Sequence, residues 1–312
     1  MDAVLKQALA SLASSPVLWD CPLCDYTSFA IGGPATALIV VEELTELQRL
    51  LLFCGEHAIQ WRIIGRGTNL LVSDTGFDGV ILLLGKGFGA ISRGEFAKSE
   101  GVVIQTGAAC SLARLGGWCI DQGISGLEFV TGIPGTIGGA VIMNAGAWGR
   151  ELAEVIVSVT VVTSSGQVCT FPRSELNFGY RIWHDHKHVR EDTETMRVLI
   201  GVELQGVIAD QEQIRSLCQS YHQKRQIKQP KGVPNAGSFF KNPPGDAAGR
   251  LIEASGLKGL RVGGAMVSPV HANFLVNSGG ATAANVLELM EKVREKVRAD
   301  SGIVLEPEVH FL

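Results

Sequence analysis

The stretch from Gly132 to Gly149 has almost no long side chains, because six of its eighteen residues are glycine and three are alanine. Glycine lacks a Cβ and tolerates positive φ, so this stretch can bring bare backbone close to a flat or charged ligand. Backbone N–H groups exposed in this way bind phosphate oxygens. We therefore predict a phosphate-binding loop here, and we expect that it cannot build an ordinary core.

A second glycine turn, Gly65–Leu70, follows the strand-like residues 61–64. It reads Gly-Arg-Gly-Thr-Asn-Leu, so it is a second, shorter segment rich in glycine and small residues. The two loops lie about seventy residues apart. Two phosphate-binding loops in one chain indicate a large diphosphate cofactor held between two layers.

The segment His222–Lys241 contains five lysine or arginine residues and no acidic residue, although the whole chain carries a net charge of −4. It is either a local anion site or a solvated basic face at a helix end, where lysines also interact favourably with the macrodipole. The second half favours a ligand-facing role, because Ser238 follows a glycine and precedes two phenylalanines and Lys241.

Hydrophobic periodicity predicts alternating helices and strands around these segments. We expect helices at 1–15, 43–55, 111–122, 211–225 and 282–299. We expect strands at 35–41, 62–64, 70–73, 80–84, 102–106, 153–163, 167–171, 196–204 and 303–312. The pattern suggests three domains, which we place at 1–85, 86–206 and 207–312.

Composition excludes several classes of protein. With 312 residues, 46% of them apolar and 19% charged, the chain is globular. Its net negative charge argues against a nucleic-acid binder. It has no apolar run long enough for a membrane span. An odd count of seven cysteines suits the reducing cytoplasm, and the single CxxC motif, Cys21 to Cys24, is more often incidental than a zinc or redox site.

Taken together, the motifs resemble those of the UDP-N-acetylenolpyruvoylglucosamine reductase family, from about Thr27 to the C-terminus. Five motifs occur in the family's order, and any one alone is weak. They are Gly65–Val72 with Asp74-x-Gly76, Gly132–Ala140 with Asn144–Gly149, Tyr180-Arg181, Asn235–Asn242 and Leu305–Val309.

This resemblance implies an α+β fold with a two-part FAD-binding region of the vanillyl-alcohol-oxidase-like (PCMH) type and a C-terminal α/β substrate domain. It implies non-covalent FAD, NADPH as co-substrate and a UDP-sugar as the other partner. The reaction would reduce the enolpyruvyl group of UDP-N-acetyl-3-O-(1-carboxyvinyl)glucosamine to UDP-N-acetylmuramate, as a UDP-N-acetylmuramate dehydrogenase does for peptidoglycan, cell shape and division. The enzyme would be cytoplasmic, without membrane insertion, and a monomer is favoured.

Three positions are catalytic by this resemblance. Arg181 would stabilise bidentately the charge that develops on the substrate carboxylate. Ser238 would donate a proton to the substrate carbon. Glu308 would help near the carboxylate only if it were protonated or strongly hydrogen-bonded, which requires that its neighbours raise its pKa.

The resemblance also assigns binding residues. The cofactor set is Gly65, Arg66, Gly67, Thr68, Asn69, Leu70, Gly132, Ile133, Pro134, Gly135, Gly138, Gly139, Asn144, Ala145 and Gly146. The substrate set is Tyr180, Arg225, Lys228 and Asn242. No metal site is expected.

Some residues depart from the family pattern. Thr68 replaces a usual serine, Trp183 stands where a serine is common, and His310 replaces an arginine that often follows Glu-Val. The histidines of 184–188 could suggest a metal site, although their hydrophilic neighbours favour an exposed loop. The chain has only three tyrosines and lacks a clear extra tyrosine-bearing loop, so it resembles the shorter, type II-like subtype.

Two other functions stay open at this point. A flavin oxidase of the same fold often attaches FAD covalently through a histidine near the first glycine loop, and here the nearest histidine in sequence is His57. A non-catalytic nucleotide-binding module is the third possibility. The combination of Arg181, Ser238 and Glu308 argues against it, because binding alone needs no proton donor.

Overall fold

The computed structural model describes residues 1–94, 101–184 and 197–312. The chain divides into two compact units, each assembled from segments that are distant in sequence. Unit 1 consists of Met1–Trp19, Ala37–Gly65 and Gly79–Gln223. Unit 2 consists of Asp20–Thr36, Arg66–Asp78 and Lys224–Leu312.

The first core of unit 1 lies between a sheet and two helices. Its four-stranded sheet has the order β1-β2-β5-β3, in which β3 and β5 run parallel. The strands are β1 (Leu18–Pro22), β2 (Pro34–Val41), β3 (Trp61–Ile64) and β5 (Phe77–Leu84), and the helices are α1 (Ala3–Leu12) and α2 (Leu44–Glu56). Helix α2 buries Leu47, Leu50, Leu51 and Cys54, whose spacing places them on one helical face.

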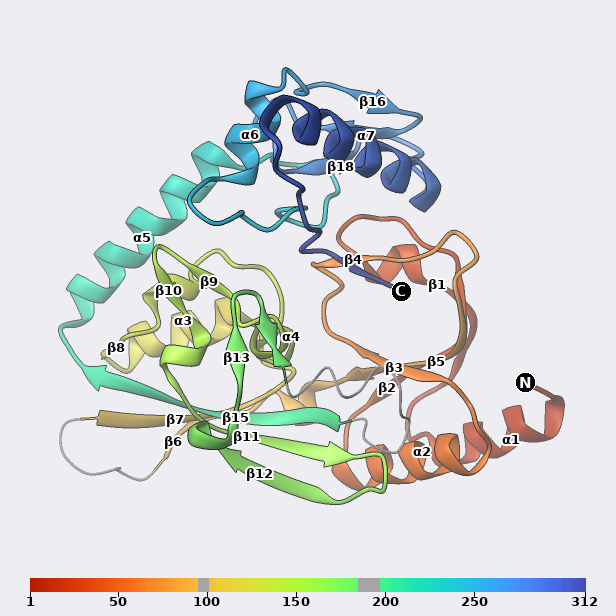
Figure 1. Ribbon diagram of the computed structural model, residues 1–312. Coiled ribbons are helices and arrows are strands. Elements are labelled where there is room, and N and C mark those ends of the chain that lie inside the picture. The colour runs from red at the N-terminus through yellow and green to blue at the C-terminus, as the bar shows by residue number, and fades with distance from the viewer. Residues whose placement is uncertain (95–100, 185–196) are drawn as a thin grey trace. The chain divides into compact units, whose positions relative to one another are not determined.

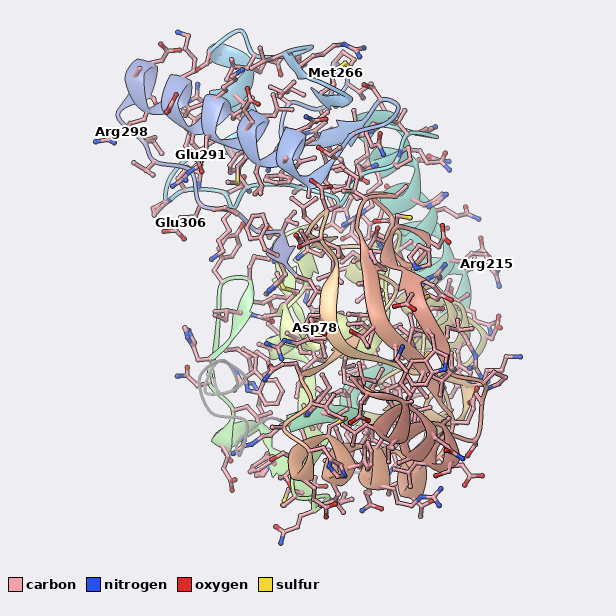
Figure 2. All side chains as sticks on the ribbon, turned by 90° about the vertical axis from the view of Figure 1, so that its right-hand side faces the viewer. Asp78, Arg215, Met266, Glu291, Arg298 and Glu306 are labelled. Atoms are coloured by element: carbon pink, nitrogen blue, oxygen red, sulfur yellow. The ribbon has the colours of Figure 1, made fainter. Side chains whose placement is uncertain are left out.

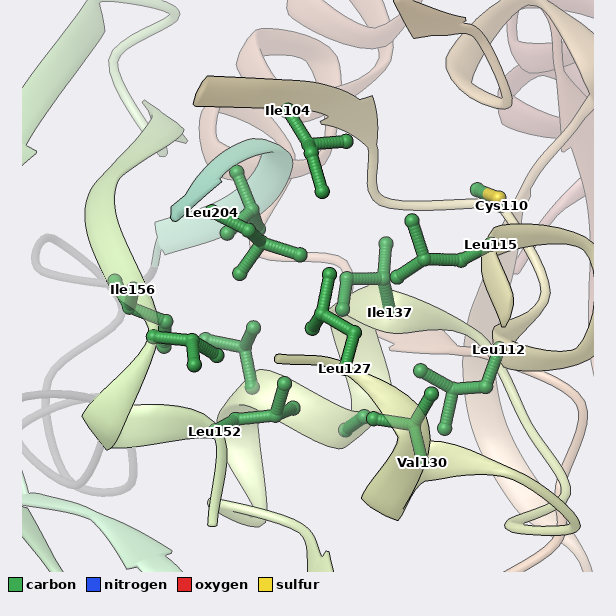
Figure 3. Packing of buried hydrophobic residues seen from close by; sticks show 14 of the residues in the cluster. Ile104, Cys110, Leu112, Leu115, Leu127, Val130, Ile137, Leu152, Ile156 and Leu204 are labelled. Atoms are coloured by element: carbon green, nitrogen blue, oxygen red, sulfur yellow. The ribbon is translucent and has the colours of Figure 1, made fainter. Parts of the chain in front are cut away.

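The second core of unit 1 lies against a six-stranded antiparallel sheet of order β12-β11-β15-β7-β6, with β8 paired to β15. Its strands are β6 (Ile91–Arg93), β7 (Gly101–Gly107), β8 (Ile124–Ser125), β11 (Ile156–Thr163), β12 (Val168–Pro172) and β15 (Arg197–Ile208). Helices α3 (Leu112–Asp121) and α4 (Ile137–Ile142) lie on one face of this sheet (Figure 1). Leu115, Leu127, Ile137 and Leu204 interdigitate between them (Figure 3).

Two short hairpins also belong to this second half of unit 1. Strands β9 (Gly146–Ala147) and β10 (Arg150–Glu151) form the first. Strands β13 (Phe178–Gly179) and β14 (Ile182–Trp183) form the second, which we call the arginine hairpin because Tyr180 and Arg181 make its turn.

Unit 2 contains a small sheet that packs against helix α7, which in turn contacts helix α6. The sheet has the order β16-β17-β18, and strands β4 and β19 pair in parallel elsewhere in the unit. The elements are β4 (Leu70–Leu71), α6 (Ala248–Ala254), β16 (Arg261–Val262), β17 (Ala265–Val267), β18 (Leu275–Asn277), α7 (Ala283–Ser301) and β19 (His310–Phe311). Helix α5 (Gln211–Lys228) begins in unit 1 and ends in unit 2.

Helix α7 shows the signals that the sequence predicts for a long amphipathic helix. Thr282 and Asn285 form a capping box at its start, and Gly302 ends it in the left-handed conformation. Its buried face includes Val286, Leu289 and Val293. Charged residues such as Glu291 and Arg298 lie on its outer face (Figure 2).

Most predicted elements occur within one to three residues of their expected bounds, and three differences are informative. The glycine stretch is not all loop, because Ile137–Ile142 form α4 and bury Ile137 and Val141 in the core. The expected strand 303–312 is reduced to β19, and before it only Pro307 pairs, in an isolated bridge with Phe240. The expected basic loop begins as the last turns of α5.

Three hydrophobic clusters occur among the described residues, two in unit 1 and one in unit 2. The first contains mainly residues below 89, the second residues 102–204, and the third mainly residues 236–309. These clusters support a proposal of three domains at 1–85, 86–206 and 207–312. The compact units nevertheless number two, so the exact boundaries remain a prediction.

Candidate active site

Gly65, the first residue of the first glycine loop, approaches the second glycine loop within unit 1. A Cβ built on Gly65 would lie 2.8 Å from Thr136 Oγ1, so the first loop approaches the second as closely as only glycine permits. Thr136 is the N-cap of α4, and its hydroxyl accepts from Gly139 N–H at 3.4 Å. Residues about seventy apart in sequence therefore lie side by side.

The backbone beside Gly65 and Thr136 fits a flat, phosphate-bearing cofactor such as FAD. Gly139 is exposed, and a Cβ built there would meet only Thr136 Oγ1, at 3.7 Å. Bare backbone thus faces open space beside Gly65, which is also exposed. Gly138 differs, because its Cβ would come within 3.0 Å of Ala108 Cβ and its side of α4 packs inward.

Asn144 connects the glycine stretch to the arginine hairpin. Its side chain is fully buried, donates to Gly179 O at 3.0 Å and accepts from Ala153 N–H at 2.9 Å. Its φ of +41° is a left-handed value that asparagine tolerates better than most residues. Both polar ends of its side-chain amide are bonded to backbone groups. Asn144 therefore affects the site by holding backbone segments in place.

Arg181 is held by the same stretch. It occupies the turn of the arginine hairpin at φ +58°, an unusual conformation for a residue other than glycine. Its Nη2 donates to Gly146 O at 3.1 Å, and Nη1 makes a longer contact of 3.5 Å to Asn144 O. The guanidinium also lies 4.8 Å from the centre of the Tyr180 ring. These contacts fix the direction of a cation whose role depends on orientation.

In unit 2 the rest of the first glycine loop contacts the C-terminal strand. Asn69 Nδ2 donates to Glu308 O at 3.0 Å, and His310 N–H donates to Asn69 O at 3.0 Å. Leu70 then pairs with His310 in the parallel β4–β19 ladder. A predicted cofactor-loop residue therefore fixes the backbone of a predicted catalytic residue.

Ser238 and Glu308 lie on neighbouring segments of unit 2. Glu308 N–H donates to Phe239 O at 2.8 Å, directly after Ser238. The pairing continues through Lys241 N–H to Glu306 O at 2.8 Å. Phe239 and Phe240 are buried and anchor the segment Gly237–Asn242, which we call the serine segment.

Asn273 also forms hydrogen bonds with the serine segment. Phe240 N–H donates to Asn273 Oδ1 at 2.9 Å, and Asn273 Nδ2 donates to Phe240 O at 2.8 Å. Phe239 N–H also donates to Asn273 O, at 2.7 Å. The side chain of Asn273 is 3% exposed. Sequence reasoning missed this residue, although a lone asparagine in the apolar run 272–276 is a signal for a buried polar group that needs partners.

The predicted substrate residues occupy different parts of the fold. Asn242 Oδ1 accepts from Ala248 N–H at 3.0 Å at the start of α6, so its oxygen is used within the fold. Arg225 and Lys228 lie in the last turn of α5, and Tyr180 is 46% exposed in the arginine hairpin. Lys241 pairs with Glu306, whose carboxylate lies at the surface of unit 2 (Figure 2).

Asp74, which belongs to the first family motif, has a structural role. Its carboxylate accepts from Ala283 N–H at 2.7 Å and from Ala284 N–H at 3.0 Å. Amides in the first turn of a helix have no acceptor within the helix itself, and a negative charge is stabilising there. The motif residue therefore caps a helix.

The cysteines and histidines provide no competing site among residues 1–94, 101–184 and 197–312. All seven thiols are free, and burial raises the pKa of Cys54 and Cys119 to about 12. Burial is also the main cause that raises the pKa of Cys21 in the CxxC motif. The described residues contain no metal-binding cluster, while 185–188 of the histidine-rich segment lie outside them.

The structure thus gathers the predicted residues into one group in each unit. Unit 1 holds Gly65, the glycine stretch with Gly132, Ile133, Pro134, Gly135, Ala145 and Gly146, and the arginine hairpin. Unit 2 holds Arg66, Gly67, Thr68, Asn69 and Leu70 with the serine segment and Glu308. Ser28 N–H donates to Gly67 O at 3.1 Å and fixes that loop.

Comparison with known proteins decides the family. Residues 35–171 match a family model described as an FAD binding domain, and residues 229–312 match the C-terminal domain of UDP-N-acetylenolpyruvoylglucosamine reductase. The reductase of that name from Desulfosudis oleivorans is 40% identical over 99% of this chain and 98% of its own length. The chain belongs to the UDP-N-acetylenolpyruvoylglucosamine reductase family. The reductase 2 of Symbiobacterium thermophilum is 42% identical over 92% of the chain and 89% of its own length.

A solved structure gives the same result. The crystal structure of the Thermus caldophilus family member superposes with a TM-score of 0.78 at 36% identity, and it covers 95% of this chain and 97% of the other. The predicted α+β fold, with an FAD-binding region followed by a C-terminal domain of this family, is therefore confirmed. No helix in the described part of the chain is both long and apolar enough to cross a membrane.

Proposed function

We propose that this chain reduces the enolpyruvyl group of UDP-N-acetyl-3-O-(1-carboxyvinyl)glucosamine to UDP-N-acetylmuramate, with NADPH as the source of electrons. The observation that carries this proposal is the pairing of Ser238 and Glu308 on bridged segments in the C-terminal domain of the family. FAD held at Gly65 and the glycine stretch would supply hydride transfer, from NADPH to the terminal carbon of the enolpyruvyl double bond.

In unit 1 the roles fall to backbone and to one cation. Gly65 and Gly139 present bare backbone to the cofactor, because neither has a side chain that would keep it away. Arg181 faces the substrate carboxylate and stabilises the charge that hydride addition places on it. Its contacts with Gly146 and Tyr180 orient the guanidinium before substrate binds.

In unit 2 the proton transfer completes the reaction. Ser238 gives its hydroxyl proton to the carbon next to the carboxylate, so that one O–H bond breaks as one C–H bond forms. The resulting alkoxide regains a proton from solvent. Glu308 acts on the substrate carboxylate from the neighbouring strand, and Arg225, Lys228 and Asn242 bind the UDP-sugar.

The experiment separates the two half-reactions. The FAD-loaded protein is mixed with NADPH, and the flavin absorbance is followed before and after the enolpyruvyl sugar nucleotide is added. We expect bleaching by NADPH and rapid recovery of colour with the substrate. Ser238→Ala should bleach normally and recover about 10² to 10⁴ times more slowly, the usual contribution of a general acid.

Ser278→Ala is the matched control, because the hydroxyl of Ser278 donates to Gly264 O elsewhere in unit 2. It should leave both half-reactions unchanged. Recovery of colour in Ser238→Ala at the wild-type rate would remove Ser238 from the mechanism. Reoxidation by oxygen that is as fast as reoxidation by the sugar nucleotide would instead indicate an oxidase.

We further propose that the enzyme acts in the cytoplasm as a monomer and supplies a precursor of peptidoglycan. Support comes from the family and from thiols that remain free. Gel filtration with light scattering tests the oligomeric state directly.

A further inference from the structure

The serine segment contains a buried backbone clamp that the proposed chemistry does not use directly. Asn273 contacts the segment through three hydrogen bonds: its main-chain oxygen accepts from Phe239, and its side-chain amide bonds both polar groups of Phe240. The side chain thus imitates the backbone of a neighbouring strand at a place where the sheet offers no continuous partner, since Phe240 otherwise forms an isolated bridge with Pro307.

The chemistry of this position requires an amide. Phe240 is 1% exposed and Asn273 is 3% exposed, so water does not replace a lost partner easily. A buried backbone group that loses its hydrogen bond costs about 1–3 kcal/mol. Among side chains of this size, only asparagine offers a donor to the carbonyl and an acceptor to the N–H at once. Aspartate would place a second acceptor against Phe240 O.

The asparagine clamp holds Phe240, two residues after Ser238. The residue before Ser238, Gly237, is held by a different contact. Gly237 N–H donates to Asn235 Oδ1 at 2.9 Å, and Gly237 has a φ of +78°. The serine therefore stands between a tight turn on one side and the asparagine clamp on the other. Its hydroxyl can keep a fixed direction only if both ends of the segment stay in place.

We propose that Asn273 is a positioning residue for the proton donor Ser238, and that it sets the rate of proton transfer without touching substrate. The inference rests on the proposed function of Ser238. A displacement of about 1 Å at a catalytic group can cost about 10²-fold in rate, so a damaged clamp should slow the oxidative half-reaction selectively.

The test compares Asn273→Asp and Asn273→Ala with the wild type in the FAD-loaded protein. Bleaching by NADPH should stay within about twofold of the wild-type rate, because it needs no proton from Ser238. Recovery of colour with the enolpyruvyl sugar nucleotide should slow by about 10- to 100-fold. Loss of a residue that only stabilises the fold would not slow the recovery of colour while it leaves the rate of bleaching unchanged.

Asn277→Asp is the matched control. Asn277 lies in β18, and its oxygen accepts from Gly279 N–H and Ala281 N–H, which lie outside the serine segment. This variant should recover colour at the wild-type rate. If the wild type turns over but the Asn273 variants show normal recovery, equal loss of both half-reactions or no folded protein at all, Asn273 is not a positioning residue. A wild type without turnover would instead overturn the proposed function.

Discussion

A buried asparagine holds each of the two catalytic regions, but it does so differently in unit 1 and unit 2. Asn144 joins two segments, Gly179 and Ala153, and its main-chain oxygen also contacts the guanidinium of Arg181. Asn273 uses both ends of its amide on one residue, Phe240. The first arrangement orients a long side chain on a hairpin turn, and the second fixes a backbone that carries a short side chain.

The difference follows from what each role demands. A guanidinium reaches its target through several rotatable bonds, so its own hydrogen bonds must define its direction. A serine hydroxyl lies one bond from Cβ, so the position of the backbone decides where its proton points. We therefore expect conservative side-chain changes to matter more in unit 1 and changes to backbone partners to matter more in unit 2.

Among the variants that test this comparison, Arg181→Lys should have the largest effect. Lysine keeps the charge but cannot maintain the contacts with Gly146 O and the Tyr180 ring as a planar fork. We expect reoxidation of the flavin by substrate to slow by about 10- to 100-fold. Stopped-flow absorbance measures it, with Arg197→Lys as a control, since Arg197 stacks 4.8 Å from the Phe171 ring in the same unit. Full turnover in Arg181→Lys would contradict the orienting role.

Asn144→Asp should show how much the first asparagine contributes to stability. The change keeps an acceptor for Ala153 N–H, removes the donor to Gly179 O and buries a charge. We expect the free energy of unfolding to fall by about 1–3 kcal/mol, as measured by urea denaturation of the apoprotein. The same substitution at the partly buried Asn277 should cost less. Equal losses would mean that Asn144 is not a special anchor.

Gly139→Ala tests the bare backbone of unit 1. A methyl group has room in the protein itself, because a Cβ at Gly139 meets only Thr136 Oγ1 at 3.7 Å. It should nevertheless weaken FAD binding by about tenfold, or 1.4 kcal/mol, if cofactor lies on this backbone. Titration of the apoprotein with FAD measures the affinity.

Gly117→Ala provides the control for this test. Gly117 is also an exposed glycine in a helix, and a Cβ there meets nothing within 4 Å. Both alanine variants should stabilise their helices by about 0.5–1 kcal/mol, but only Gly139→Ala should bind FAD more weakly. The same FAD affinity in both would place the cofactor elsewhere.

The smallest effect concerns pH and unit 2. Burial, and then the positive charge of Lys258, lowers the pKa of His271 from its ordinary value of 6.5. The folded protein therefore favours neutral His271, while the unfolded chain takes up a proton near pH 6.5. The stability that is present above this pH is lost as the pH falls through the lowered folded pKa.

Urea denaturation at pH 7, 6 and 5 checks this expectation. The free energy of unfolding should fall more steeply with decreasing pH in the wild type than in His271→Gln. His271 Nδ1 accepts from Asn273 N–H at 3.2 Å, and a protonated Nδ1 could not accept this hydrogen bond. Protonation of His271 would therefore also weaken the asparagine clamp of unit 2. Parallel pH profiles for the two proteins would show that His271 does not contribute.

The sequence alone predicted the family, the α+β fold and the longer helices and strands. Regular patterns made this possible: Leu47, Leu50 and Leu51 mark α2, and the spacing of Val286, Met290 and Val293 marks α7. Glycine motifs with fixed order identified the FAD-binding region. These signals are local, so they survive without knowledge of what packs against them.

The tertiary structure decided which residues support the chemistry. That Gly65 meets Thr136, that Asn69 and Glu308 share a hydrogen bond, and that Asn273 clamps Phe240 cannot be read from spacing. Each contact joins residues more than thirty positions apart. Side-chain amides can bond any exposed backbone group, so only the folded chain selects their partners. The physical reason is that local sequence preference decides whether a segment forms a helix or a strand. Which hydrogen-bond partners its buried polar groups obtain depends on the segments that pack against it.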